Sequence, residues 1–394
     1  DAGLWSHEIE FWGGDLHSLT GRLDHVQALG ADVLYLNPVH LAGTNHKYDV
    51  FDHHRVSPEF GRREDLQALV QNLHARGMKL VLDGVFNHMG RQAPVFKEAE
   101  AAYRAESTAA AAGSAYRHWF VFGPQYPGGA RCWWQVHNLR ELNLEHPAVR
   151  EHVYGAPGSV VRSHLREGAD GWRLDVAADI GFQWLEELTR AAHAEKPGSL
   201  VVGEVANYPK EWFPALDGVI NFTLRSIVLQ AAAGDLDPAL AQRMIDRLAA
   251  ECGTAPLLKS WLMLDNHDTA RLASVLPGQR QRRLAQVLQF TLPGAPCLYY
   301  GSEVGMTGGD MAHEGARFRD YKGICERTPL IMLDSQSRQH AGGFAQNGET
   351  GKLIHGLLGW DSLVPESMAM YEHSHLPFRV ASKSGPEARM WALE

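Results

Sequence analysis

Apolar residues along this chain gather in short runs, and longer stretches with helical spacing separate them. A short apolar run that is buried on both faces is typical of a parallel strand. The pattern predicts seven such strands, at residues 33–36, 80–86, 171–176, 200–205, 219–222, 261–264 and 297–300. Apolar residues recur with the helical period between most of them, as at 62–76, 182–194 and 279–290. Strands that alternate with helices predict parallel β/α units.

Polar side chains follow four of these strands at the point where each strand ends. The four segments are 83–88 (DGVFNH), 171–175 (GWRLD), 203–205 (GEV) and 265–268 (DNHD). Acids and histidines at the carboxyl ends of several strands are typical of the catalytic mouth of a (β/α)8 barrel. The sequence therefore predicts an α/β fold, a (β/α)8 TIM barrel, with a catalytic site at that end.

The connection between residues 88 and 171 is far longer than a β/α unit needs. It contains an alanine-rich helical piece at 99–112 and an aromatic segment at 131–135 (RCWWQ). Near its end, residues 155–158 (GAPG) are expected to break or kink a helix.

Composition narrows the possible partners. The chain has 394 residues with 45% hydrophobic content, enough for one large core or for a barrel with a small annex. Its net charge is −9 without a basic cluster, which argues against nucleic acid and anionic membranes as partners. No apolar run reaches transmembrane length and no signal pattern opens the chain. We expect a cytoplasmic protein, or a secreted one whose signal has been removed; the oligomeric state stays open.

The four cysteines are widely scattered, which favours buried free thiols over disulfides. They lack the close pairing of a metal site. They are Cys132, Cys252, Cys297 and Cys325.

The four polar segments, taken in order, resemble the four sequence regions of the α-amylase family, glycoside hydrolase family 13. A fifth stretch, 45–52 (NHKYDVFD) followed by 58–61 (PEFG), is similar to the cyclomaltodextrinase, neopullulanase and maltogenic amylase branch. The resemblance implies a small domain inserted after the third barrel strand. The expected organisation is a first part of the catalytic barrel at 1–88, the inserted domain at 89–146, the rest of the barrel at 147–310 and an atypical C-terminal region at 311–394.

Both chain ends differ from the family pattern. Relatives carry their first barrel strand upstream of the segment that matches 11–15 (FWGGD), and only eleven residues precede Trp12 here. Our hypothesis is that residues 4–10 or 376–382 occupy the first-strand position, because a gap in a barrel leaves unpaired backbone groups. An open barrel that a partner chain fills, or a fragment of a longer enzyme, is the alternative. Circular permutation, truncation and scrambled ends would each explain the difference.

Breaking a glycosidic bond takes two carboxyl groups in opposite protonation states. The resemblance implies that Asp175 is the nucleophile, Glu204 the acid/base and Asp268 a third acid that holds sugar hydroxyls and favours the transition state. Family members retain the anomeric configuration, which requires roughly 5 to 5.5 Å between the nucleophile and the acid/base.

Further residues are expected to bind the substrate. His88 and His267 match histidines that hydrogen-bond the sugar before the scissile bond, Tyr48 matches the aromatic platform beneath that sugar, and Arg271 helps to hold the site. Arg173 lies two residues before Asp175, so both point to one face of a strand and the cation favours an ionised carboxylate.

Two features stay open. Trp133 and Trp134 suit core packing of the inserted domain and substrate stacking equally well. Asn87 matches a calcium-binding asparagine of many α-amylases, but Ala178 and Asp179 stand where such enzymes often have lysine and histidine. Calcium needs several oxygen ligands, and no convincing set is present. We expect no cofactor and no obligatory metal, with calcium as the less favoured alternative.

The predicted function is that of a retaining α-glucan hydrolase. It would cleave α-1,4, and as a second option α-1,6, glucosidic bonds of maltooligosaccharides or cyclodextrins by double displacement. The alternatives are a transglycosylase or sugar isomerase of the same family, or a non-catalytic barrel used for binding. Residues 205–208 (VANY) replace the usual Ile-Trp-His of the branch after Glu204, so the linkage preference stays open.

Overall fold

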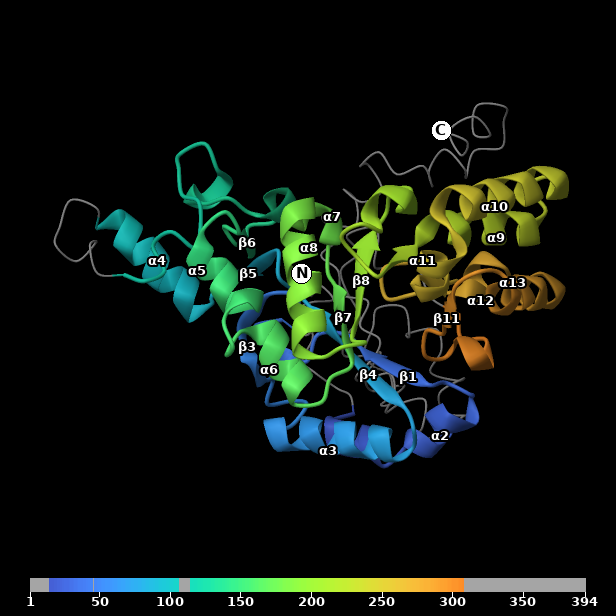
Figure 1. The fold of residues 1–394 in the computed structure, drawn as a ribbon, viewed down its shortest axis with the longest axis horizontal. Coiled ribbons are helices and arrows are strands. Elements are labelled where there is room, and N and C mark those ends of the chain that lie inside the picture. The colour runs from blue at the N-terminus through green and yellow to red at the C-terminus, as the bar shows by residue number, and fades with distance from the viewer. Residues whose placement is uncertain (1–13, 45, 106–113, 308–394) are drawn as a thin grey trace, which may run out of the picture. The chain divides into compact units, whose positions relative to one another are not determined.

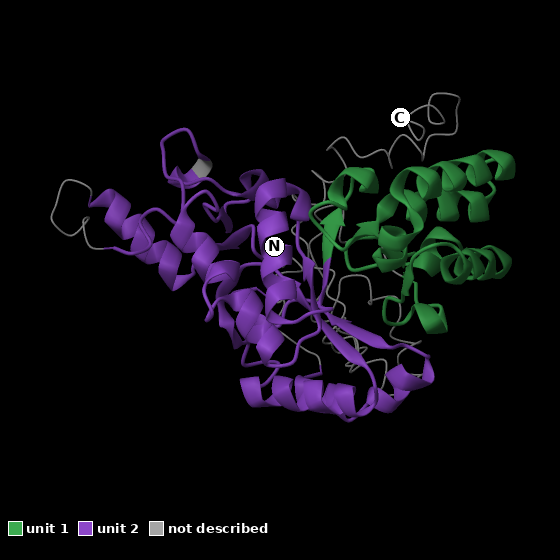
Figure 2. Cartoon of the chain, in the orientation of Figure 1, with its two compact units in different colours: residues 1–13, 202–394 green, residues 14–201 purple. Residues whose placement is uncertain are grey.

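The structure is a computed structural model that describes residues 14–44, 46–105 and 114–307 (Figure 1). The hypotheses on residues 4–10 and 376–382 fall outside the described residues. The chain divides into two compact units (Figure 2). Unit 2 comprises residues 14–201, and unit 1 comprises residues 1–13 and 202–394, of which 202–307 are described.

Three parallel strands form the sheet of unit 2. They pair in register, with Val33 opposite Lys79 and Val81 opposite Gly171. Every residue of the third strand is buried, as expected for a parallel strand that is covered on both faces. The strands are β1 (Val33–Leu36), β4 (Lys79–Gly84) and β7 (Gly171–Leu174).

Helices of unit 2 bury one apolar stripe each. In α3, Leu66, Leu69 and Leu73 are buried at helical spacing. The expected helix break is present, because a π-helix ends at Gly155 and the next helix begins only at Val160. The helices are α1 (Leu16–Thr20), α2 (Leu23–Ala28), α3 (Arg63–Ala75), α4 (Pro94–Arg104), α5 (Pro147–Arg150), η5 (Glu151–Gly155), α6 (Val160–Arg166), α7 (Ala177–Ile180) and α8 (Phe182–Glu195).

Two short antiparallel pairs complete unit 2. One pairs β2 (His40–Ala42) with β3 (Val50–Val56), and the other pairs β5 (His88–Gly90) with β6 (Leu139–Glu141). Strand β6 lies close to two single-turn helices, η3 (Pro127–Gly129) and η4 (Trp133–Gln135), in the long connection. The connection therefore begins at β5, returns to pair with it at β6, and then continues through α5, η5 and α6 to β7. Its helix α4 covers the first part of the alanine-rich piece, and residues 106–113 are not described.

Unit 1 continues the alternation of strands and helices. Parallel pairing joins β8 to β9, β9 to β10 and β10 to β11. A core that includes Leu224, Val228, Leu248 and Leu262 lies between these strands and their helices. The elements are β8 (Leu200–Val205, which begins in unit 2), η6 (Pro209–Trp212), β9 (Gly218–Asn221), α9 (Phe222–Ala233), α10 (Pro238–Cys252), α11 (Thr254–Lys259), β10 (Trp261–Met263), α12 (Leu272–Val275), α13 (Gln279–Thr291), β11 (Ala295–Cys297) and η7 (Ser302–Val304).

One predicted strand is displaced. The last was expected at 297–300, whereas β11 covers Ala295–Cys297. Residues 298–300 leave the ladder because the chain turns at Gly301, where the amide of Ser302 bonds the carbonyl of Tyr299 at 3.1 Å. The other six predicted strands lie within two residues of the observed bounds. In the described part of the chain Cys132, Cys252 and Cys297 are free thiols, and Cys325 lies outside it.

Candidate active site

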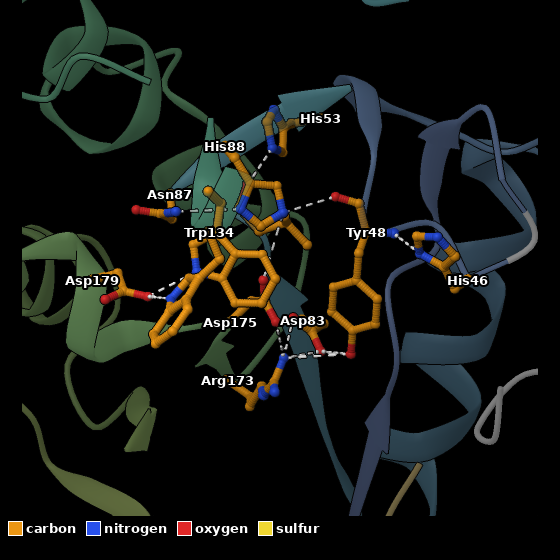
Figure 3. A network of polar contacts seen from close by, with 12 residues as sticks. His46, Tyr48, His53, Asp83, Asn87, His88, Trp134, Arg173, Asp175 and Asp179 are labelled. Carbon is orange, nitrogen blue, oxygen red and sulfur yellow. Dashed lines mark hydrogen bonds and ion pairs between the residues drawn. The ribbon is translucent and has the colours of Figure 1, made fainter. Parts of the chain in front are cut away.

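Arg173 joins two acids at the ends of strands β4 and β7. The ladder places Asp83 opposite Arg173, and Asp175 follows β7 directly. One guanidinium nitrogen of Arg173 donates to Asp83 Oδ2 at 2.8 Å and to Asp175 Oδ1 at 3.0 Å (Figure 3). The side chains of Arg173 and Asp83 are buried, and that of Asp175 is 9% exposed. A buried cation at this distance favours the ionised form of Asp175.

Two tyrosines complete the surroundings of Asp83. The hydroxyl groups of Tyr35 and Tyr48 donate to Asp83 Oδ2 at 2.5 and 3.2 Å. Burial, followed by the negative charge of Asp83, raises the pKa of Tyr48 well above its usual range. Tyr48 is therefore a neutral donor at any pH at which the protein would work. Its ring stacks on His46 and also lies 5.9 Å from the Arg173 guanidinium.

His88 is held as a neutral hydrogen-bond donor beside Asp175. Its Nε2 donates to the Tyr48 carbonyl at 3.1 Å and lies 3.9 Å from Asp175 Oδ2 (Figure 3). Burial lowers the pKa of His88 to about 4, against the opposing effect of that hydrogen bond. The imidazole is therefore a neutral ring whose N–H is held by the Tyr48 carbonyl, and it adds no positive charge beside Asp175.

In unit 1, the turn after β10 places a histidine and an acid together. His267 Nε2 lies 3.3 Å from Asp268 Oδ2. Asn266 braces the turn, since its Nδ2 donates to Asp268 Oδ2 and its Oδ1 accepts from the Asp268 amide, both at 3.2 Å. Asp268 and His267 therefore present polar atoms from a constrained loop. Glu204 is buried near the end of β8 in the same unit.

Arg271 is fully buried in unit 1 and lies over two tyrosine rings. It donates to the Tyr300 carbonyl, and its guanidinium lies 3.9 Å from the Tyr299 ring centroid and 4.3 Å from that of Tyr300. Such stacking fixes the side chain. Arg271 thus anchors the segment that follows the His267–Asp268 turn.

The structure brings four predicted residues of unit 2 together: Tyr48, His88, Arg173 and Asp175. Sequence reasoning quoted Asp83 as the start of a polar segment but gave it no role, and it missed Tyr35. The signal for Asp83 was present, because it ends an apolar strand as Asp175 does. Tyr35 carried no such signal, since it stands inside the run of β1.

Trp133 and Trp134 separate into two environments. Trp133 is 4% exposed and its ring centroid lies 5.9 Å from that of His88. Trp134 is 40% exposed. Trp133 is therefore packed in the core, whereas part of the Trp134 ring is exposed to solvent.

Asn87, which matches a calcium-binding asparagine of many α-amylases, directs its amide nitrogen toward His88 Nδ1 at 3.4 Å. Within residues 14–44, 46–105 and 114–307, no group of three or more His, Cys, Asp or Glu side chains is placed to hold a metal ion. The surroundings of Asn87 therefore offer no acidic cage for calcium, and metal independence stays a prediction. No described helix combines the length and the apolar character that crossing a membrane requires.

Parallel β/α units with buried acids at the strand ends are typical of a (β/α)8 barrel whose site lies at that end of the strands. The chain belongs to the α-amylase family: residues 5–345 match the family described as alpha amylase, catalytic domain. Its fold is the (β/α)8 barrel of that family, as expected.

Curated relatives lie in the expected branch. The chain is 36% identical to a cyclomaltodextrinase of a Bacillus species over 76% of this chain and 53% of the relative. It is 33% identical to neopullulanase 2 of Thermoactinomyces vulgaris over 76% of this chain and 51% of the relative. The chain thus spans about half the length of the curated relatives it matches.

A solved structure is similar over a larger share of its length. It is the ligand-free cyclic α-maltosyl-(1→6)-maltose hydrolase of Arthrobacter globiformis, at a TM-score of 0.71 and 30% identity. The match covers 85% of this chain and 80% of that one.

Proposed function

We propose that this protein is a retaining α-glucan hydrolase. Its substrates would be maltooligosaccharides or cyclodextrins, with α-1,4 bonds as the main target and α-1,6 bonds as a second one. The names of its relatives support this class, since they include hydrolases of cyclodextrins and of cyclic maltosyl-maltose.

The observation that carries the proposal is the position of Arg173 between two carboxylates. A nucleophilic carboxylate has to be ionised and held still. The contact of 3.0 Å between Arg173 and Asp175 Oδ1 supplies the charge. Asp83, itself fixed by Tyr35 and Tyr48, holds the guanidinium from its other side. Because these contacts are formed before the reaction, the groups do not have to reorganise in the transition state.

The reaction would proceed in two displacements. In the first, an Asp175 oxygen forms a bond to the anomeric carbon while the glycosidic C–O bond breaks, and Glu204 gives its proton to the leaving oxygen. In the second, Glu204 takes a proton from water, whose oxygen bonds to the anomeric carbon and releases Asp175. Asp268 would hold the sugar hydroxyl groups and favour the positive charge that develops on the ring.

Neutral groups would orient the sugar at Asp175. His88 would bind a sugar hydroxyl by sharing with it the Nε2–H that it donates to the Tyr48 carbonyl, and the Tyr48 ring is suited to the apolar face of glucose. His267 would bind a second hydroxyl group. Arg271 would act indirectly, by fixing the chain after Asp268.

The proposal also covers the binding partner, the cellular location and the cofactors of the protein. We propose an oligosaccharide as the main partner, in line with the maltose and cyclic tetrasaccharide complexes of the Arthrobacter globiformis enzyme. A cytoplasmic location is proposed because one relative is named an intracellular maltogenic amylase. No cofactor and no obligatory metal are part of the proposed mechanism.

The test is release of reducing sugar from maltotriose and β-cyclodextrin, followed by chromatography. Wild-type protein should release shorter maltooligosaccharides. Asp175→Asn should fall below a few per cent of that rate with an unchanged circular dichroism spectrum, because the amide keeps the shape and removes the nucleophile. Phe290→Ala, an exposed aromatic truncation on α13, serves as the control and should match wild type. A folded wild-type sample without turnover would overturn the proposal.

A further inference from the structure

Trp134 presents an exposed indole at the edge of the Asp175 site. The contacts lead there step by step: Asp175 lies beside His88, the His88 ring beside Trp133, and the Trp133 ring 6.3 Å from Trp134 in an edge-on arrangement. Trp134 is 40% exposed, whereas Trp133 is 4% exposed. The Trp134 ring is therefore partly open to solvent. Two ring contacts connect it to His88, which lies beside the proposed nucleophile Asp175.

One carboxylate fixes both indoles. Asp179 Oδ2 accepts from Trp133 Nε1 at 2.8 Å and from Trp134 Nε1 at 3.3 Å (Figure 3). Asp179 lies in the short helix α7, four residues after Asp175. The orientation of the indole pair is thus tied to the segment that carries the proposed nucleophile.

The backbone on both sides of this contact is strained. Trp134 and Gln135 have φ angles of 45° and 65°, and Val176, the residue after Asp175, has a φ angle of 41°. Left-handed conformations are uncommon for non-glycine residues and are outliers for β-branched ones. Strain of this kind persists where the surrounding structure enforces it, and it is frequent at ligand clamps.

The loop that carries Trp134 is closed at its base. Cys132 forms an antiparallel backbone bridge with Arg140 of β6, and the amides of Val136 and Leu139 donate to the carbonyls of Trp133 and Val136. A closed, strained loop holds an aromatic ring in one orientation, and so lowers the entropy cost of binding against it.

From these contacts we propose that Trp134 is a substrate-binding platform for a sugar unit of a maltooligosaccharide beyond the bond that is cleaved, and that Asp179 is the positioning residue that sets its ring. This inference rests on the proposed function and adds a residue and its support to that site. The apolar face of a glucose ring would pack on the exposed indole face, while the indole N–H stays with Asp179. The charge of Asp179 does not take part in the reaction.

Binding in an inactive background tests the proposal apart from turnover. In Asp175→Asn protein, maltotriose affinity would be measured by calorimetry with and without Trp134→Ala. The dissociation constant should rise about tenfold, equal to ~1.4 kcal/mol. Trp134→Phe should restore most of the affinity, since it keeps an aromatic face. Phe290→Ala in the same background should bind as its parent does.

A double-mutant cycle tests the role of Asp179. Asp179→Ala should weaken binding nearly as much as Trp134→Ala, and the double variant should bind no more weakly than Trp134→Ala alone, because the two changes remove one feature. Asp179→Asn keeps an acceptor oxygen and should lie between wild type and Asp179→Ala. Additive losses would contradict the positioning role.

Kinetics with active protein separate this inference from the proposed function. Trp134→Ala should raise KM for maltotriose and leave kcat within about twofold, because the platform binds ground state and transition state alike. Unchanged binding of maltotriose by Trp134→Ala, or no measurable binding by the Asp175→Asn parent, would overturn the inference. Two results together would overturn the proposed function and leave this inference standing. The wild-type protein would show no turnover, and Trp134→Ala would still weaken maltotriose binding in the Asp175→Asn background.

Discussion

Five histidines of unit 2 pack ring to ring in its interior, and we predict that acid unfolds the chain through them. Their ring centroids form a closed set of contacts, from 5.1 Å for the closest pair to 6.3 Å for the most distant one. Trp172 and Phe86 border the cluster. The members are His40, His53, His54, His152 and His164.

The hydrogen bonds of the cluster suit neutral rings. His164 Nδ1 donates to the Val160 carbonyl, so its Nε2 accepts from His40 Nε2 at 3.2 Å. His53 Nε2 donates to the Val85 carbonyl at 2.7 Å. A second proton on His164 would set two N–H groups against each other at that distance of 3.2 Å.

Burial is the largest cause of the lowered pKa values in this cluster. It lowers the pKa of His53 to about 3, those of His152 and His164 to about 4, and that of His40 well below its usual range. The pKa of the half-buried His54 is also lowered. Two further charges face the cluster. The negative charge of Asp52 acts to raise the pKa values of His54 and His152. The positive charge of Arg63 acts to lower those of His54 and His164.

The direction in which stability changes with pH follows from proton binding. An unfolded histidine has a pKa of about 6.5, so between pH 6.5 and 4 the unfolded chain holds protons that the folded chain lacks. The free energy of unfolding therefore falls as the pH falls, by ~1.4 kcal/mol per pH unit for each such histidine. The four most buried members act in the same direction, and the stability of a typical domain is only about 5 to 15 kcal/mol. We therefore expect the fold to be lost in acid, below the unfolded pKa of histidine.

The assay is urea unfolding between pH 7.5 and 5, followed by circular dichroism. His40→Phe keeps a ring in place and removes one titrating group, so below pH 6.5 its stability should change with pH less steeply than that of wild type, by at most ~1.4 kcal/mol per pH unit. Val161→Ala, a truncation of a buried apolar residue in the same helix as His164, should lower stability equally at every pH. Equal slopes for His40→Phe and wild type would refute the reasoning.

Three further outcomes are expected. Glu204→Gln should be almost inactive on natural glucans but far less impaired in the first step on substrates with activated aryl leaving groups, which need little protonation; equal damage to both would argue against the acid/base role. Proton NMR of a fresh hydrolysate should show the α-anomer at the new reducing end, whereas an initial burst of β-anomer would contradict retention. Turnover should survive exhaustive treatment with EDTA, and a loss that calcium alone restores would show that a metal is needed.

Much of the fold could be predicted because each parallel strand is a short apolar run that ends in a polar segment. The rule located β4, β7, β8 and β10 together with the acids in or just after their last residues. It also indicated the helix break, since residues 155–158 combine two glycines with a proline. It failed for β11, because the apolar run 297–300 continues past the last ladder residue into a turn.

The pattern of residues predicted site residues at or directly after the ends of strands, and the family resemblance added Tyr48, which lies before β3. Arg173 and Asp175 share a face through their spacing of two. The contacts of Asp83 with Tyr35 and Tyr48 join residues 48 and 35 positions apart in the chain, and no local pattern encodes them. The separation of Trp133 from Trp134 depends on a left-handed backbone at Trp134, which periodicity does not show.

The most direct test of the central claim is the identity of the carboxylate that bonds to the sugar. In Glu204→Gln protein, a substrate with an activated leaving group would still form the glycosyl-enzyme, while its hydrolysis would be slowed by loss of the general base. Peptide mass spectrometry of the acid-quenched reaction should then find one hexosyl or maltosyl adduct, on Asp175. An adduct on another residue, or aryl release in excess of enzyme with no adduct at any time, would contradict the assignment of Asp175 as the nucleophile.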